Sequence, residues 1–156
     1  ACHVVASATQ VGLTQALGIK MSSSVFLHKF YQGREVTTSF RQVIDFLGRH
    51  GSPGTGQYNN EITFPPEEIG DLASVVGSEI DGALCVAIDR PLINDQFRLF
   101  VFEAMQQFGF SAYEDTFDWV YVPLGSSNDV PQTLLEELSH GVQEVRAAAQ
   151  LWPSDA

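Results

Sequence analysis

Hydrophobic and polar positions change their periodicity several times in the first half of the chain. Val25 to Tyr31 is rich in β-forming residues and predicts a first strand. Phe40, Val43, Ile44 and Leu47 follow the helical spacing i, i+3, i+4, i+7, with Thr37 or Thr38 as the expected cap and Gly51 as the expected stop. Residues 51–57 predict an exposed turn. Tyr58 to Phe64 predicts a second strand, ended by two prolines.

The second half shows the clearer patterns. Glu67 to Val76 is ambiguous between a short helix and an irregular connection, whereas Ala83 to Asp89 is almost wholly apolar, as in a central strand. Asn94 caps a predicted helix with an apolar stripe that ends at Gly109. Segments 110–113 and 117–123 predict a hairpin. A last helix is expected from Pro131, with its buried side at Leu134, Leu135, Leu138, Val142 and Val145.

This order of elements, β-α-β-β-α-β-β-α, predicts an α+β fold. We expect a mostly antiparallel sheet with helices packed on one face, built on a ferredoxin-like split β-α-β core and extended by a C-terminal helix. The length predicts one domain over residues 21–156. Residues 1–20 contain no acid and precede Met21, so we expect them to be a non-native or upstream extension that the fold does not need.

Charge divides the chain into two unequal parts. Residues 1–60 carry five Lys and Arg against two acids, a net of 5 − 2 = +3, whereas residues 61–156 carry three Arg against seventeen acids, a net of 3 − 17 = −14. The sum is the overall charge of −11. A field of this sign repels phosphates and attracts basic surfaces. With only two lysines in the chain, nucleic-acid binding is not expected.

Motifs that would indicate catalysis or a cofactor are weak. Residues 51–56 (GSPGTG) resemble the start of a phosphate-binding loop, but Gln57 and Tyr58 stand where its Lys and Ser/Thr are needed. The four histidines are scattered, without metal-ligand spacing outside the Cys2–His3 pair. Cys85 lies in an apolar run and is expected to be a buried free thiol, although a disulfide with Cys2 is possible. We therefore predict no catalytic residues, no cofactor and no metal.

The acids of the second part lie among aromatic residues around the predicted hairpin. Aromatic side chains surrounded by charge are typical of protein interfaces. A solubilising acidic coat is the alternative. The residues expected to contact a partner are Glu103, Tyr113, Glu114, Asp115, Asp118, Trp119, Glu136 and Glu137.

The size from Met21 onward, the excess of acid and the block Phe102 to Pro123 (FEAMQQFGFSAYEDTFDWVYVP) resemble the immunity proteins of bacterial toxins, including those against type VI secretion effectors. A free thiol at Cys85 would favour a reducing compartment, so we expect a cytoplasmic protein. The resemblance implies an inhibitor that covers the basic nucleic-acid-binding or catalytic cleft of a cognate toxin, often a nuclease. Two alternatives stay open: a phage protein that mimics nucleic acid, and a small enzyme or ligand-binding domain. In the enzyme, His28 and Asp89 would meet in a polar pocket.

Overall fold

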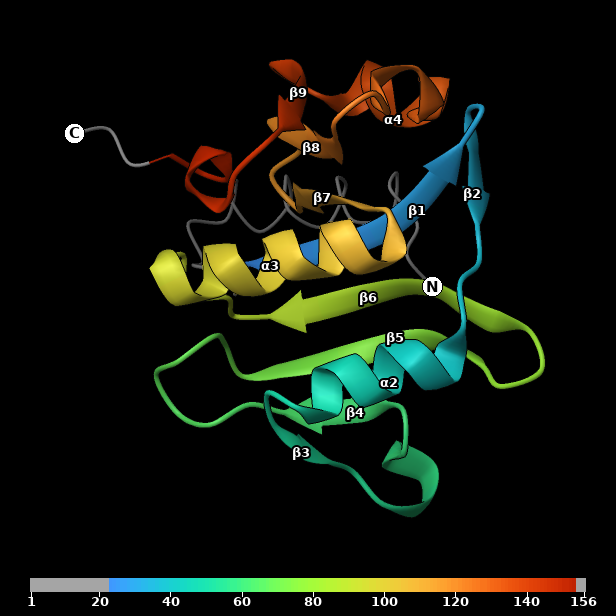
Figure 1. The fold of residues 1–156 in the computed structure, drawn as a ribbon, viewed down its shortest axis with the longest axis vertical. Coiled ribbons are helices and arrows are strands. Elements are labelled where there is room, and N and C mark those ends of the chain that lie inside the picture. Colours follow the sequence, from blue (N-terminus) through green and yellow to red (C-terminus); the bar gives the residue numbers. More distant parts are fainter. Residues whose placement is uncertain (1–22, 154–156) are drawn as a thin grey trace, which may run out of the picture.

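A nine-stranded open sheet organises residues 23–153, the part of the chain that this computed structural model describes (Figure 1). Its strands run in the order β3-β4-β5-β6-β1-β7-β8-β9, and β2 pairs only with β1. All pairs are antiparallel except β8 with β9. The strands are β1 Ser24–Tyr31, β2 Arg34–Val36, β3 Ser52–Pro53, β4 Glu61–Thr63, β5 Leu72–Ser78, β6 Gly82–Asp89, β7 Phe110–Glu114, β8 Trp119–Pro123 and β9 Gly141–Val145.

Two helices cover one face of the sheet and form the main core. In α2 (Phe40–Gly48) the side chain of Ser39 caps the first turn, one residue after the expected threonines. In α3 (Asp95–Phe108) Asn94 caps the start, and Gly109 ends the helix in the left-handed conformation with φ of 75°. Both sequence signals of α3 are confirmed. Their apolar stripes pack on β1, β5 and β6, where Val25, Leu27 and Ile88 are buried.

A smaller core lies on the opposite face. The pleat turns Phe30 away from Leu27, and Phe30 packs with Tyr113, Val120 and Leu134. Leu134 belongs to α4 (Gln132–Glu137), a helix of six residues. The sequence predicted that all helices would pack on one face of the sheet. This is wrong for α4, which lies across the sheet from α2 and α3.

The last predicted helix is wrong beyond Glu137. Gly141 has φ of 136° and opens β9, which runs to Val145 beside β8. The chain is already extended at Leu138, a glycine with this positive φ does not continue a helix, and the β-branched Val142 and Val145 suit a strand. Leu138, Val142 and Val145 have the helical spacing i, i+4, i+7, although Leu138 follows α4 and the two valines lie in β9. This spacing led to the prediction of one long helix.

Other short strands were also missed. The ambiguous stretch contains most of β5, the turn predicted over residues 51–57 contains β3, and β2 at Arg34–Val36 was not predicted. The expected second strand is shorter than predicted, since Gly56–Tyr58 is a 3-10 helix and β4 begins at Glu61. The hairpin of β7 and β8 is confirmed. The fold class is confirmed as α+β with a mostly antiparallel sheet, whereas the ferredoxin-like core is not confirmed in a sheet of nine strands.

Cys85 is fully buried in β6 and is disulfide-bonded, so the expectation of a free thiol there is wrong. Its partner lies outside residues 23–153, as does the extension expected over residues 1–20. None of the helices described in residues 23–153 is both long enough and apolar enough to cross a membrane.

Candidate functional site

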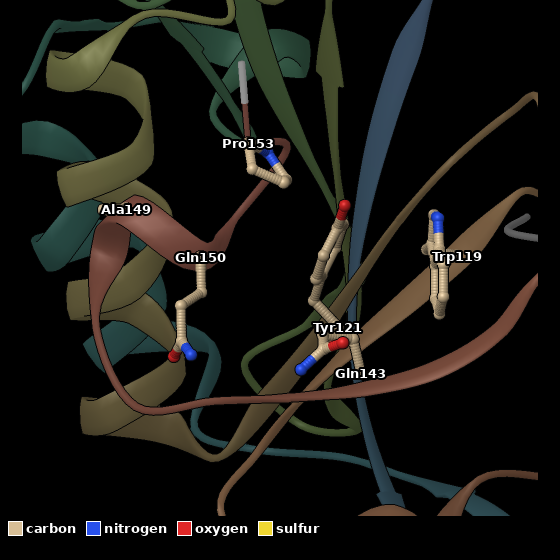
Figure 2. A pocket seen from close by; sticks show the side chains of 6 residues that line it. All are labelled: Trp119, Tyr121, Gln143, Ala149, Gln150 and Pro153. Atoms are coloured by element: carbon tan, nitrogen blue, oxygen red, sulfur yellow. The ribbon is translucent and has the colours of Figure 1, made fainter. Parts of the chain in front are cut away.

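The end of the sheet formed by β7, β8 and β9 carries an open pocket of about 340 Å³. Strand β8 contributes Trp119 and Tyr121, β9 contributes Gln143, and the segment after β9 closes it (Figure 2). We call this the β8–β9 pocket. Its lining residues are Trp119, Tyr121, Gln143, Ala149, Gln150 and Pro153.

Strand registers bring these side chains together. Trp119 and Tyr121 are two residues apart on β8, so they point from the same face of the sheet. The parallel register pairs Tyr121 with Gln143 and Trp119 with Gly141. Gly141 has no side chain, so the ring of Trp119 has no neighbour from β9 beside it on the pocket face. The pocket thus follows from a bulky residue on β8 opposite a glycine on β9.

Trp119 is the exposed aromatic of the pocket, with 37% of its surface accessible. The ring of His140 stacks on it, with centroids 5.2 Å apart and planes at 18°. Because β9 runs parallel to β8, His140 lies on the side of Asp118, away from Tyr121. The Trp119 face that lines the pocket is therefore the one turned toward Tyr121, and Tyr121 itself is only 4% exposed.

Carboxylates stand beside the aromatic rings. Continuing the β7–β8 register by one residue places Glu114 opposite Trp119. Burial raises the pKa of Glu114, the negative charges of Asp115 and Asp118 raise it further, and a hydrogen bond from the Trp152 side chain opposes them. Burial raises the pKa of the Tyr121 hydroxyl and the charges of Glu114 and Asp118 raise it further, whereas a hydrogen bond to the Trp152 backbone and the charge of Arg98 oppose them. This end of the pocket is a place where positive charge would be stabilised.

Two side-chain amides are held in fixed orientations. Gln143 donates from Nε2 to the backbone carbonyl of Glu144 at 2.9 Å, which leaves its Oε1 as an acceptor. Gln150 accepts at Oε1 from the backbone N–H groups of Arg146 (2.6 Å) and Ala147 (3.1 Å), which leaves its NH₂ as a donor. Figure 2 shows the Gln143 amide next to Tyr121 and the Gln150 amide extending from the closing segment on the other side of the pocket.

The closing segment is fastened by one arginine of α3. Arg98 donates from Nε to the carbonyl of Leu151 at 2.8 Å and from Nη2 to the carbonyl of Trp152 at 2.8 Å. Its Nη1 forms an ion pair with Asp95 at 3.2 Å. Trp152 packs on Phe97 and edge-on to Tyr121, with centroids 5.5 and 5.1 Å apart. The pocket wall from Ala149 to Pro153 is thus anchored to the main core through Leu151 and Trp152, whereas Ala149, Gln150 and Pro153 are exposed.

Two of the residues expected to contact a partner are inside the protein. Tyr113 is 1% exposed and packs in the smaller core, where its hydroxyl lies 3.4 Å from Nδ1 of His28. Asp115 is 7% exposed and accepts the backbone N–H of Ser24 at 3.0 Å, which fixes the start of β1. Both side chains are buried in this conformation, so neither has the accessible surface that a contact with a partner would need.

The other expected contact residues are exposed but dispersed. Trp119 lines the β8–β9 pocket, and two acids lie near it: half-buried Glu114, opposite it in the continued β7–β8 register, and exposed Asp118, which precedes it and accepts the Ser139 hydroxyl at 2.6 Å. Glu103 lies on α3, beside a groove lined by Arg49 and His50. Glu136 and Glu137 end α4, which packs on the opposite face of the sheet. The structure therefore brings three of the eight together.

The pairing considered for an enzyme does not form. His28 pairs across the sheet with Cys85, and Asp89 pairs with Ser24. Four residues of β1 separate the two positions, a distance of about 13 Å along a strand. Asp89 is hydrogen-bonded to the Ser24 hydroxyl at 3.3 Å instead. Within residues 23–153, no group of three or more His, Cys, Asp and Glu could hold a metal ion.

Gln143, Gln150, Trp152 and Pro153 were missed from the sequence. Their positions depend on β9, which had been predicted as helix, and on the return of the chain over α3. The one available signal was the pair Trp119 and Tyr121, whose alternation predicts that they share a face of a strand.

No protein-family model matches the sequence, and no curated protein or solved structure matches it.

Proposed function

We propose that this protein is an acidic inhibitor that binds a basic protein partner, of the kind exemplified by toxin immunity proteins. The observation that carries the proposal is the β8–β9 pocket: an exposed tryptophan beside the Glu114 and Asp118 carboxylates, within a segment of net charge −14. An accessible aromatic ring near one partly desolvated carboxylate, Glu114, and one exposed carboxylate, Asp118, suits a cationic side chain.

Charge supports the proposal at longer range. An acidic surface steers a basic partner into encounter and thereby raises the association rate. An aromatic residue that becomes buried on binding then slows dissociation, as interface anchors do. Occlusion of a basic cleft, as in a nuclease-type toxin, needs no catalytic group on the inhibitor. The protein would act by covering a site rather than by chemistry.

We also infer that β6, α3 and β7, with β1 between the two strands, are the split β-α-β unit expected from the sequence. This unit would hold β7 and β8 in register behind the pocket. The cytoplasmic location expected from the sequence rested partly on a free Cys85 thiol, so it is not part of the proposal.

The test is a comparison of two variants with the same change in charge. Glu114→Gln with Asp118→Asn removes two charges next to Trp119 (the pocket variant), and Glu136→Gln with Glu137→Gln removes two on α4 (the α4 variant). A partner co-purified from the native host is immobilised, and association is measured at low and high salt. We expect the pocket variant to associate several-fold more slowly at low salt, with a smaller difference at high salt because ions screen the charges.

The α4 variant is the matched control and should associate nearly as the wild type does. Equal slowing by both variants would mean that net charge acts without a localised site. Indifference to salt and to both variants would reduce the acids to a solubilising coat. A partner that proves to be a nucleic-acid-binding defence complex would favour the mimicry alternative over toxin inhibition.

A further inference from the structure

The β8–β9 pocket discriminates between cations by its shape as well as its charge. Its exposed wall is the flat face of Trp119, which is backed by His140 and cannot tilt away without breaking that stack. A flat wall favours a ligand that is itself planar, because a planar group contacts the whole ring face. The guanidinium of arginine is planar and stacks on aromatic faces, whereas the ammonium of lysine is compact and strongly hydrated.

The polar groups around that wall suit a group made of donors. Glu114 lies opposite Trp119 across the β7–β8 ladder, and Asp118 adds a second negative charge. Gln143 presents an acceptor oxygen, since its NH₂ is held by the carbonyl of Glu144. A guanidinium carries five N–H donors and no acceptor, so it can bond a carboxylate and the Gln143 oxygen together.

The amide of Gln150 can bind the main chain of the partner residue whose side chain enters the pocket. Gln150 has its oxygen occupied by two backbone N–H groups and offers only N–H donors. An arginine side chain has no acceptor for them, but the main-chain carbonyl of the same residue does. The pocket volume of about 340 Å³ lies within the range of small-ligand pockets and suits one long side chain.

From this arrangement we infer that the β8–β9 pocket is a receptor for one arginine side chain of the basic partner, stacked on Trp119 and paired with Glu114. The inference rests on the proposed function, since it names the group of the partner that the pocket would hold. Specificity for arginine over lysine is its distinguishing consequence.

The experiment uses the full chain and small probes, so it needs no partner. The chain has two tryptophans, Trp119 and Trp152, and hence two indole N–H signals in a ¹H–¹⁵N spectrum. Trp119 reports stacking, and Trp152 reports the Glu114 carboxylate because its side chain bonds to it. The protein is titrated with the N-acetyl methylamides of arginine, lysine and citrulline. Citrulline has nearly the shape of arginine without its charge.

We expect the arginine probe to shift both indole signals saturably, the lysine probe to bind at least about 5-fold more weakly, and citrulline to shift neither. Trp119→Leu should abolish the effect on Trp152, whereas Trp119→Phe should retain part of it. Glu136→Gln, far from the pocket, is the control and should bind as the wild type does.

Equal binding of arginine and lysine would overturn the inference, because a simple cation site needs no planar ligand. Binding of citrulline as strong as that of arginine would overturn it too. The ligand would then be recognised by the Gln143 and Gln150 amides and not by its positive charge. Neither result tests the proposed function, which is tested by the association kinetics of the charge variants with the partner. Failure of the inference and failure of the proposed function are therefore distinguishable.

Discussion

Glu114 is subject to two opposing requirements. Burial and its acidic neighbours raise the pKa of its carboxyl above the ordinary 4.5, so ionisation opposes folding. The same charge is what a bound cation would need. We expect Glu114→Gln to raise the thermal midpoint at neutral pH and to weaken arginine binding several-fold. The glutamine oxygen can still accept the Trp152 N–H.

The sign of the pH dependence is fixed by the direction of the shift. The wild type should lose stability relative to Glu114→Gln as the pH rises from 4.5 through the raised pKa, and the two should converge in acid. Thermal unfolding across pH 3.5 to 8 measures this. A constant gap between the two midpoints at all pH values would show that the carboxyl does not titrate abnormally.

His28 is the buried titratable group of the opposite face. It is 0% exposed, its Nε2 has no hydrogen-bond partner within residues 23–153, and burial lowers its pKa from 6.5 to about 4. The Glu35 carboxylate 3.4 Å from Nδ1 would favour the charged ring, but that carboxylate is partly exposed and solvated, so burial dominates. The imidazole is therefore neutral at pH 7.

Stability should fall as the pH drops from about 6.5 toward 4, because the unfolded chain takes up a proton that folded His28 refuses. The loss is at most about 3 kcal/mol for a shift of this size. His28→Leu should flatten most of this dependence in denaturant unfolding. His50→Gln is the comparison, since burial also lowers the pKa of half-buried His50. The same change in unfolding free energy between pH 7 and 4.5 in the wild type and in His28→Leu would contradict this account, because the opposite contribution of Glu114 is common to both proteins.

At the scale of elements, α3 was predicted most fully from the sequence. Its cap, its stripe and its terminal glycine are local signals, and local signals survive any tertiary arrangement. Phe100 stands at the centre of that stripe, 2% exposed, with its ring against Phe46 and Phe64. We expect Phe100→Ala to cost about 3–5 kcal/mol in the free energy of unfolding. A loss below about 1 kcal/mol would mean that α3 does not pack as described.

Strand β9 could not be predicted for the opposite reason. Its identity depends on pairing with β8 in parallel, a contact that exists only after α4 has turned the chain back. Hydrophobic spacing alone could not separate the helix from the strand, because Leu134, Leu138 and Val142 fit a helical repeat. The candidate site could therefore be predicted only in part: Trp119 was expected to contact a partner, whereas Gln143 lies in β9 and was not expected.

The closing segment of the pocket makes its own prediction. Arg98 is 12% exposed in its side chain and bonds two carbonyls of that segment, so Arg98→Met should free it while keeping much of the apolar stem. Hydrogen bonds to charged groups contribute about 1.5–3 kcal/mol, and we expect a loss near that size. Arginine-probe binding should weaken more than stability alone explains. Unchanged binding in Arg98→Met would show that the pocket does not need this wall.

At the scale of the whole molecule, composition and element order predicted the α+β class, but not which acids would share a surface. Charge density along a chain does not report position in space. Asp115 and Asp118 are three residues apart, yet one fixes β1 inside the protein and the other is exposed and accepts a hydrogen bond from the Ser139 hydroxyl. Only the sheet order separates the two roles.

The central position of β1 has a consequence for the way the chain is made. Apart from short β2, its neighbours come much later: Ser24 bonds to Asp89, 65 residues on, and to Asp115, 91 residues on. At about 5–20 residues per second, a ribosome needs roughly 3–13 s to deliver the first of them. During that interval the segment VFLHKFY is an apolar strand with both long partners unmade. Overproduction should therefore favour nascent chains that associate with one another, and slower synthesis with available chaperones should raise the soluble yield.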